Sequence, residues 1–269
     1  MTPIIASITA TVPILAVLIF FSLEKRFAGN SGIIWFIYIT GGLLSFIVGE
    51  VNNFFVNIFS GGKWENLANI PYLAFFEELF KFAVVYFFIR KSIEKYSLLN
   101  IFFFGMSVAL GFATMENIQY VFTFKDQWVY VSIIRVLLTV PMHAITGGII
   151  AMFLCVYLKG GKEIEYNIYG IGLGVLIHAS FNFFVSFGSA FYTFLGFFVV
   201  AVGIATATFS YKKLLLIIDE TKPTTDTTSF ETSKPTKPME SKEEKRESFK
   251  IVTKEKDKKD FKIISRKKK

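Results

Sequence analysis

The sequence predicts an all-α membrane protein: a polytopic bundle of about seven transmembrane helices, with the N-terminus outside and a disordered cytoplasmic tail. Residues 1–218 hold only 13 basic and 10 acidic side chains. Between these charges lie apolar runs of roughly 20 residues, enough to cross a hydrocarbon core about 30 Å thick. Residues 219–269 carry 16 basic and 11 acidic side chains. We therefore divide the chain into a transmembrane domain, 1–218, and a charged tail, 219–269. The apolar runs of the first part exclude a soluble globular enzyme.

Seven apolar runs are long enough to be membrane spans. They cover residues 4–23, 33–59, 70–90, 98–123, 129–158, 166–187 and 190–217. The first run has no basic residue before it and Glu24-Lys25-Arg26 after it, the reverse of a cleavable signal peptide, so we expect an uncleaved helix. The second and fifth runs exceed the usual length, which indicates tilted helices or an interfacial first turn.

The basic loop residues set the predicted orientation. Nine of them lie at or just beyond the C-terminal ends of the first, third, fifth and seventh spans, whereas only Lys63 and Lys125 lie on the other side. Because cytoplasmic loops are enriched in Lys and Arg, we predict a multi-pass protein of the cell membrane with its tail in the cytoplasm. The net charge of +8 is too dispersed to indicate a nucleic-acid-binding protein.

The tail is rich in charged residues, Ser, Thr and Pro and poor in aliphatic residues. It cannot bury enough apolar surface to offset the entropy lost on ordering, so we predict disorder. Its basic end, Arg266 to Lys269, could contact anionic lipid headgroups or could remain a solvated spacer.

Several ionisable or amide side chains fall inside the apolar runs. They are Glu77, Glu78, Lys81, Glu116, Asn117, Arg135, His143, His178 and Asn182. Polar groups are costly in hydrocarbon, so those that occur there are functional candidates by default. Both histidines of the chain belong to this set. The sequence therefore predicts a polar site inside the membrane.

Depth and spacing bring these groups together. At 1.5 Å per residue, Glu78 and Glu116 would each lie about 10 Å below the outer surface. On the same scale His178 would lie about 14 Å down and His143 about 20 Å. His178 and Asn182 are four residues apart and so share a helix face. We expect a hydrated pocket in the outer half of the bilayer.

Small residues recur every four positions on three of the predicted helices. The rows are Gly105, Ala109, Ala113 and Asn117; Arg135, Thr139, His143, Gly147 and Ala151; and Gly170, Gly174, His178 and Asn182. Small residues at this spacing let helix backbones approach closely in a membrane. Each row also contains a polar group, so we expect the polar site where these helices pack.

Two chemistries fit these residues. Adjacent carboxylates cannot both ionise cheaply at low dielectric, and Lys81 can neutralise either Glu77 or Glu78 because it follows them by one helical turn. A carboxylate beside an imidazole can act as general base toward water, while His178 and Asn182 could donate hydrogen bonds to an oxyanion. Alternatively, Glu78, His143 and His178 could bind zinc and leave a position open for water. Both chemistries hydrolyse an acyl bond.

Other hydrolase designs are excluded by the sequence. The chain contains no HExxH motif, so it has no zincin-like site. Asp126 is the only aspartate of residues 1–218 and falls in a predicted loop, which excludes an intramembrane aspartyl dyad. The spans contain no GxSxG serine motif. A glutamate and histidine site remains.

Four motifs follow one another on successive predicted helices. They are Glu77-Glu78-x-x-Lys81, Gly111-x-x-x-x-Glu116-Asn117, His143-x-x-x-Gly147 and His178-x-x-x-Asn182. In this order, over roughly residues 70–187, they resemble the PrsW family of intramembrane proteases, which belongs with the CAAX prenyl proteases and bacteriocin-processing membrane proteins. The wider group often carries Glu-Glu-x-x-x-Arg. Here Phe82 takes the place of that arginine, which favours the PrsW branch.

The resemblance implies a multipass membrane endopeptidase. Families of this kind cleave a membrane-anchored anti-sigma factor on its extracytoplasmic side. Glu77 and Glu78 match the paired glutamates, His143 and His178 the histidines, and Asn182 the oxyanion-type asparagine. The candidate catalytic residues are Glu77, Glu78, Lys81, Glu116, Asn117, His143, His178 and Asn182, and the candidate zinc ligands are Glu78, His143 and His178.

Three other interpretations stay open at this point. Buried Glu and His chains also form proton relays, so an ion- or proton-coupled transporter is a rival, although we find no internal repeat. A prenyl-type endopeptidase would act on the cytoplasmic side, and a non-catalytic scaffold would have no use for these ionisable groups.

Arg135 is either a counter-ion of the pocket or a side chain that extends to the outer leaflet. We interpret Glu50 and Asn53 as interfacial.

The orientation can be tested by cysteine labelling. Cysteines placed at Gly62 and Asp126 should react with an impermeant thiol reagent in intact cells, and one at Ser92 should not, because the positive-inside rule places only Ser92 in the cytoplasm. Labelling at position 92 instead would invert the topology and favour the prenyl-type endopeptidase.

Overall fold

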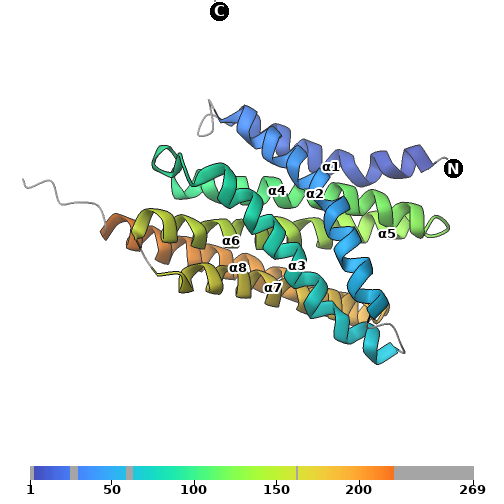
Figure 1. Cartoon of the computed structure of the whole chain (residues 1–269). Coiled ribbons are helices and arrows are strands. Elements are labelled where there is room, and N and C mark those ends of the chain that lie inside the picture. Colours follow the sequence, from blue (N-terminus) through green and yellow to red (C-terminus); the bar gives the residue numbers. More distant parts are fainter. Residues whose placement is uncertain (1–2, 25–29, 59–62, 162, 221–269) are drawn as a thin grey trace, which may run out of the picture. The chain divides into compact units, whose positions relative to one another are not determined.

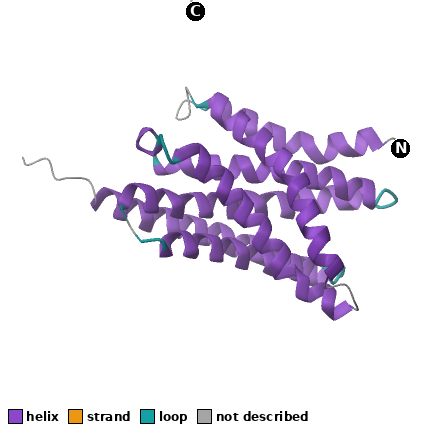
Figure 2. Ribbon diagram, viewed as in Figure 1, coloured by secondary structure: helices purple, strands orange, loops and turns teal. Residues whose placement is uncertain are grey.

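The structure, a computed structural model, describes residues 3–24, 30–58, 63–161 and 163–220. The described residues form helices joined by short connections, with no strand among them (Figures 1 and 2). The helices are α1 (Pro3–Leu23), α2 (Ser31–Ile58), α3 (Lys63–Ile89), η2 (Ile93–Lys95), α4 (Leu98–Thr123), α5 (Trp128–Ile134), η3 (Arg135–Thr139), α6 (Val140–Gly160), α7 (Glu165–Val185) and α8 (Ala190–Glu220). The predicted tail lies almost wholly outside the described residues.

The helices confirm the predicted all-α polytopic membrane fold. Of the described helices, five are long and apolar enough to cross a membrane: α2, α4, the continuous segment Trp128–Gly160, α7 and α8. Helix α3 has the length but carries Glu77, Glu78 and Lys81 within its apolar stretch. It also begins at Lys63, earlier than the predicted residue 70. In α1 the apolar stretch Ser7–Leu23 is shorter.

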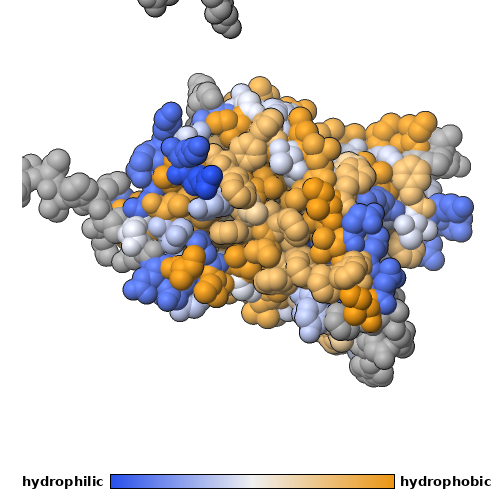
Figure 3. Space-filling view, viewed as in Figure 1, coloured by the Kyte–Doolittle hydropathy of each residue, from blue (hydrophilic) through white to orange (hydrophobic). Residues whose placement is uncertain are grey.

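The molecular surface has the character of a membrane protein. Figure 3 shows an apolar band across the middle of the helices, with hydrophilic residues gathered toward both ends. Large apolar side chains such as Phe87 and Leu176 are more than half exposed. Such a surface would aggregate in water, and it matches the hydrocarbon core of a bilayer.

Close backbone packing places α4 at the centre of the bundle, in contact with α2 on one side and α6 on the other. A Cβ atom on Gly105 of α4 would collide with the carbonyl oxygen of Gly147 of α6, and one on Gly147 would collide with the carbonyl of Gly105. A Cβ on Gly147 would also lie 2.7 Å from that of Ala109. The predicted rows of small residues on these two helices are thus confirmed as a contact surface.

The predicted fifth span is one continuous segment interrupted by a π-helical turn. Helix α5 runs into η3, Arg135–Thr139, which has π-helical geometry, and α6 follows directly. Pro141 comes two residues later and has no amide hydrogen to donate to the preceding turn. Single π-helical turns are frequent at functional sites, and this one carries Arg135 at its start.

Candidate active site

Four segments of the bundle bring the predicted polar residues into one cluster. Helix α3 contributes Glu77, Glu78 and Lys81, α4 contributes Glu116 and Asn117, η3 and α6 contribute Arg135 and His143, and α7 contributes His178. All of them except Glu116 are buried. Their contacts bring these groups side by side. The side chains are long enough to meet although the sequence predicts different depths in the membrane for the residues that carry them.

Glu78 is the centre of the hydrogen bonding. Its Oε1 atom accepts from Lys81 Nζ at 2.9 Å and from Thr146 Oγ1 at 3.2 Å. The same oxygen lies 2.7 Å from His178 Nδ1. Because an ionised carboxylate can only accept, Nδ1 of His178 carries the proton of this bond and its Nε2 atom is left with a lone pair. The other carboxylate oxygen of Glu78, Oε2, is buried and has no hydrogen-bond partner.

Glu77 faces the other side of His178. Asn52 of α2 donates to Glu77 Oε1 at 3.3 Å. The second oxygen of Glu77, Oε2, is buried without a hydrogen bond and lies 3.7 Å from His178 Nε2 and 4.0 Å from Lys81 Nζ. Each of the adjacent glutamates therefore keeps one carboxylate oxygen without a hydrogen bond in the buried cluster.

His143 connects the two halves of the cluster. Its Nδ1 atom lies 2.9 Å from Lys81 Nζ, and its Nε2 atom lies 2.9 Å from Glu116 Oε2. Because an ammonium group only donates, Nδ1 accepts from Lys81 and Nε2 donates to Glu116. The rings of His143 and His178 pack edge to face, with centroids 4.8 Å apart. The two imidazoles thus belong to one site.

Arg135 is the counter-ion of this site and does not extend to the outer leaflet. Its Nη2 atom lies 2.7 Å from Glu116 Oε2, and its Nε atom donates to Asn117 Oδ1 at 2.6 Å. The guanidinium stacks over the ring of Tyr120 at 3.9 Å, and the residue is only 7% exposed. A planar guanidinium can hold two neighbouring acceptors at once, which fixes both Glu116 and Asn117.

A metal ion fits part of this cluster. Ligand atoms of Glu77, His143 and His178 all lie within 4.8 Å of one another. Buried, unpaired Glu77 Oε2 faces the lone pair of His178 Nε2, as two ligands of one zinc ion would. Glu78 accepts from the other nitrogen of His178, the arrangement that typically orients a zinc-binding histidine. Both nitrogens of His143 have protein partners, so zinc binding there would replace one of these contacts.

In the structure, Glu77 and Glu78 have different neighbours from those in the sequence hypothesis. That hypothesis placed Glu78 with His143 and His178 around zinc. In the structure the carboxylate that joins the two histidines is that of Glu77, whereas Glu78 Oε1 is already bonded to Lys81, His178 and Thr146.

One predicted site residue lies outside the cluster, and two residues of the cluster were not predicted. Asn182 is half-buried one turn after His178, and no hydrogen bond to its side chain occurs among the described residues. Thr146 and Asn52 were missed, since neutral side chains in a span resemble packing residues. Asn52 follows Glu50 by two residues and precedes Asn53, and both of these are exposed, in keeping with an interfacial position.

Comparisons with known proteins agree with this geometry. The profile of the PrsW family intramembrane metalloproteases matches residues 30–207. The chain is 30% identical over 177 residues to Protease PrsW of Halalkalibacterium halodurans, covering 64% of this chain and 80% of that protein. No solved structure matches the chain. The matched residues contain every member of the buried cluster, and the chain therefore belongs to the PrsW family of intramembrane metalloproteases.

Proposed function

We propose that this membrane protease hydrolyses a peptide bond of a membrane-anchored protein near the outer face of the membrane. The observation that carries the proposal is the convergence of Glu77, His143 and His178 within 4.8 Å inside the helical bundle. A scaffold gains nothing from such a cluster, and burying it unpaired would be costly. The outward position follows from the predicted orientation of the spans.

In the proposed mechanism Glu77, His143 and His178 would hold a zinc ion. Zinc would supply a Lewis acid for the scissile carbonyl and would activate a water molecule. Glu78 acts as the general base, because its buried Oε2 atom has no partner and can accept a proton from water. Lys81, bonded to Glu78 Oε1, keeps that carboxylate ionised before the proton arrives.

The remaining residues stabilise the oxyanion and orient the ring of His143. The side-chain amide of Asn182, one turn beyond His178, donates to the oxyanion that forms as the carbonyl is attacked. Glu116, held by Arg135, orients the ring of His143. The proton acceptor and one metal ligand thus come from α3, the oxyanion donor and a second ligand from α7, and the third ligand from α6, so the packing of these three helices sets their spacing.

The substrate class that we propose is a membrane-anchored anti-sigma factor cut at its extracytoplasmic side. The support is the membership of the PrsW family together with a polar site buried among transmembrane helices. A cytoplasmic tail, as predicted, would leave the active site and the polybasic end on opposite sides of the membrane.

Substitution of the cluster tests the proposal. We expect Glu78→Gln, His143→Ala and His178→Ala each to lower proteolysis by at least about 100-fold, as for a lost general base or ligand. Mass spectrometry of new protein termini in cells, wild type against Glu78→Gln, identifies the substrate and measures its cleavage. Glu165→Gln, the same change at an exposed position of α7, should cleave normally. Wild-type cleavage by all three variants would refute the proposal.

Arg135 provides an independent test of the positioning network. We expect Arg135→Gln to lower proteolysis by about 10- to 100-fold, because Glu116 loses the cation that orients it. The double variant Arg135→Gln/Glu116→Gln should be no less active than Glu116→Gln alone, since both residues act on His143 through one contact. Multiplicative losses in the double variant would show instead that Arg135 acts separately.

A further inference from the structure

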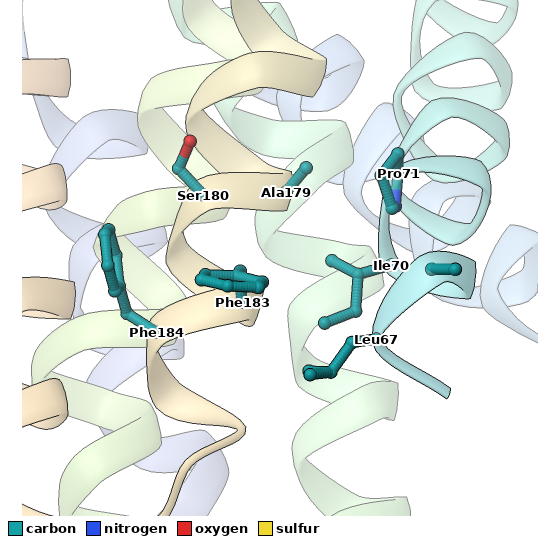
Figure 4. Close-up of a pocket in the computed structure, with 8 residues that line it drawn as sticks. Leu67, Ile70, Pro71, Ala179, Ser180, Phe183 and Phe184 are labelled. Carbon is teal, nitrogen blue, oxygen red and sulfur yellow. The ribbon is translucent and has the colours of Figure 1, made fainter. Parts of the chain in front are cut away.

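An apolar groove opens beside the active site, between α3 and α7. It has a volume of about 430 Å³ and is lined on α3 by residues that include Leu67, Ile70 and Pro71. On α7 it is lined by residues that include Ala179 and Phe183. Figure 4 shows Leu67 and Ile70 pointing across the groove toward Ala179 and Phe183. The volume is typical of ligand-binding pockets, which range from about 300 to 1,000 Å³.

The groove lies next to the active site along both helices. Ala179 directly follows His178, and Ile70 and Pro71 precede Glu77 and Glu78 by seven residues, about two helical turns on the same faces. The bond of 2.7 Å between His178 and Glu78 joins α3 to α7 at the site. Toward the start of α3 and the end of α7 the two helices are separated by the groove instead.

The lining selects an apolar occupant. None of the groove residues is charged, and only Ser180 has a polar side chain. Phe183 is 40% exposed, on a molecule whose surface is otherwise suited to lipid. A charged or strongly polar segment would lose its hydration here without gaining a partner, whereas an apolar membrane segment would not.

The backbone of α3 adds a feature suited to a substrate. Pro71 has no amide hydrogen, so it cannot donate the helical bond that the carbonyl of Leu67 would otherwise accept. A peptide bond must leave its helix to be cleaved, and its amides then need acceptors within the hydrocarbon. Because Leu67 lines the groove, its carbonyl is one acceptor that such an amide could use.

We propose that this groove, which lies on the outer side of Glu77, Glu78 and His178 in the predicted orientation, receives the outer end of the apolar membrane segment of the substrate. The proposal rests on the proposed protease function and names the substrate contact that this function needs. The catalytic groups require such a route, because Glu78 is fully buried and His178 is only 1% exposed.

Fluorescence quenching in lipid vesicles tests the groove without requiring cleavage. The probe is a synthetic transmembrane helix of alternating Leu and Ala with a nitroxide at its outer end. The protein is the full chain with Glu78→Gln. It carries a fluorophore on a cysteine at one of two positions: Ala68→Cys, at the groove, or Ala201→Cys, at an exposed alanine of α8. Native Cys155 is buried, and labelling of the chain without an added cysteine gives the blank.

We expect saturable quenching at position 68 and only gradual, non-saturating quenching at position 201. Ala179→Trp, which fills the groove, should weaken the saturable component at least tenfold, and Ala201→Trp in the chain labelled at position 68 should leave it unchanged. Phe183→Ala, which removes apolar lining, should weaken it as well and serves if Ala179→Trp elutes as an aggregate in gel filtration.

Three results would overturn the groove assignment. These are equal non-saturating quenching at both positions, saturable quenching at position 68 that survives both groove variants, and energy transfer between two chains labelled at position 68 without the probe. The last would mean that a second copy fills the groove. Because these measurements use the Glu78→Gln chain, absence of proteolysis in cells would refute the proposed function and would leave the binding result as a separate finding.

Discussion

The buried pair of Glu78 and Lys81 is the interaction on which the rest of the site depends. Both side chains are fully buried in a helix whose remaining middle residues are largely apolar. Removing one partner of such a pair leaves an uncompensated charge, at a cost of about 3–5 kcal/mol. The Coulombic attraction alone does not repay desolvation, so further hydrogen bonds are required. Thr146 and His178 donate to Glu78, and His143 accepts from Lys81. The contacts that compensate the buried charges of α3 thus also bring the candidate catalytic residues together.

This constraint explains why helix packing and chemistry coincide. Gly105 and Gly147 let α4 approach α6 closely enough for Glu116 to reach His143. On α7, a Cβ atom at Gly174 would lie 2.7 Å from Cδ1 of Ile150 on α6 and 3.8 Å, an ordinary contact distance, from Cγ of Glu78, so glycine lets α7 pack closely against α6 beside Glu78. The same close approach that gives helices their stability in lipid brings imidazole and carboxylate within hydrogen-bond distance.

Much of the fold and the membership of the site could be predicted from the sequence. Apolar run length gave α4 its bounds to the residue, and polar residues within the runs identified Glu77, Glu78, Glu116, His143 and His178 as one cluster. The sequence could not assign separate roles to Glu77 and Glu78. Consecutive residues point about 100° apart on a helix, so their partners depend on how α3 is rotated against its neighbours.

Other details depend on the same tertiary information. Arg135 lies in the π-helical turn, which the hydrophobic periodicity of the sequence does not reveal. Asn52 reaches Glu77 because α2 packs beside α3. The start of α3 was placed too late, since the stretch before residue 70 is less apolar than the span itself. Membership of the PrsW family removes the transporter and scaffold interpretations that residue chemistry alone left open.

In the mechanism that we propose, Glu77 and Glu78 differ in role: Glu77 binds the metal, and Glu78 orients His178 and accepts the proton. The zinc content of the purified chain after saturation with zinc and gel filtration tests this difference. We expect about one zinc per chain for the wild type and for Glu78→Gln, since losing an orienting partner weakens binding by only about 10- to 100-fold. We expect loss of zinc for Glu77→Gln. Zinc retained by Glu77→Gln and lost from Glu78→Gln would contradict this assignment.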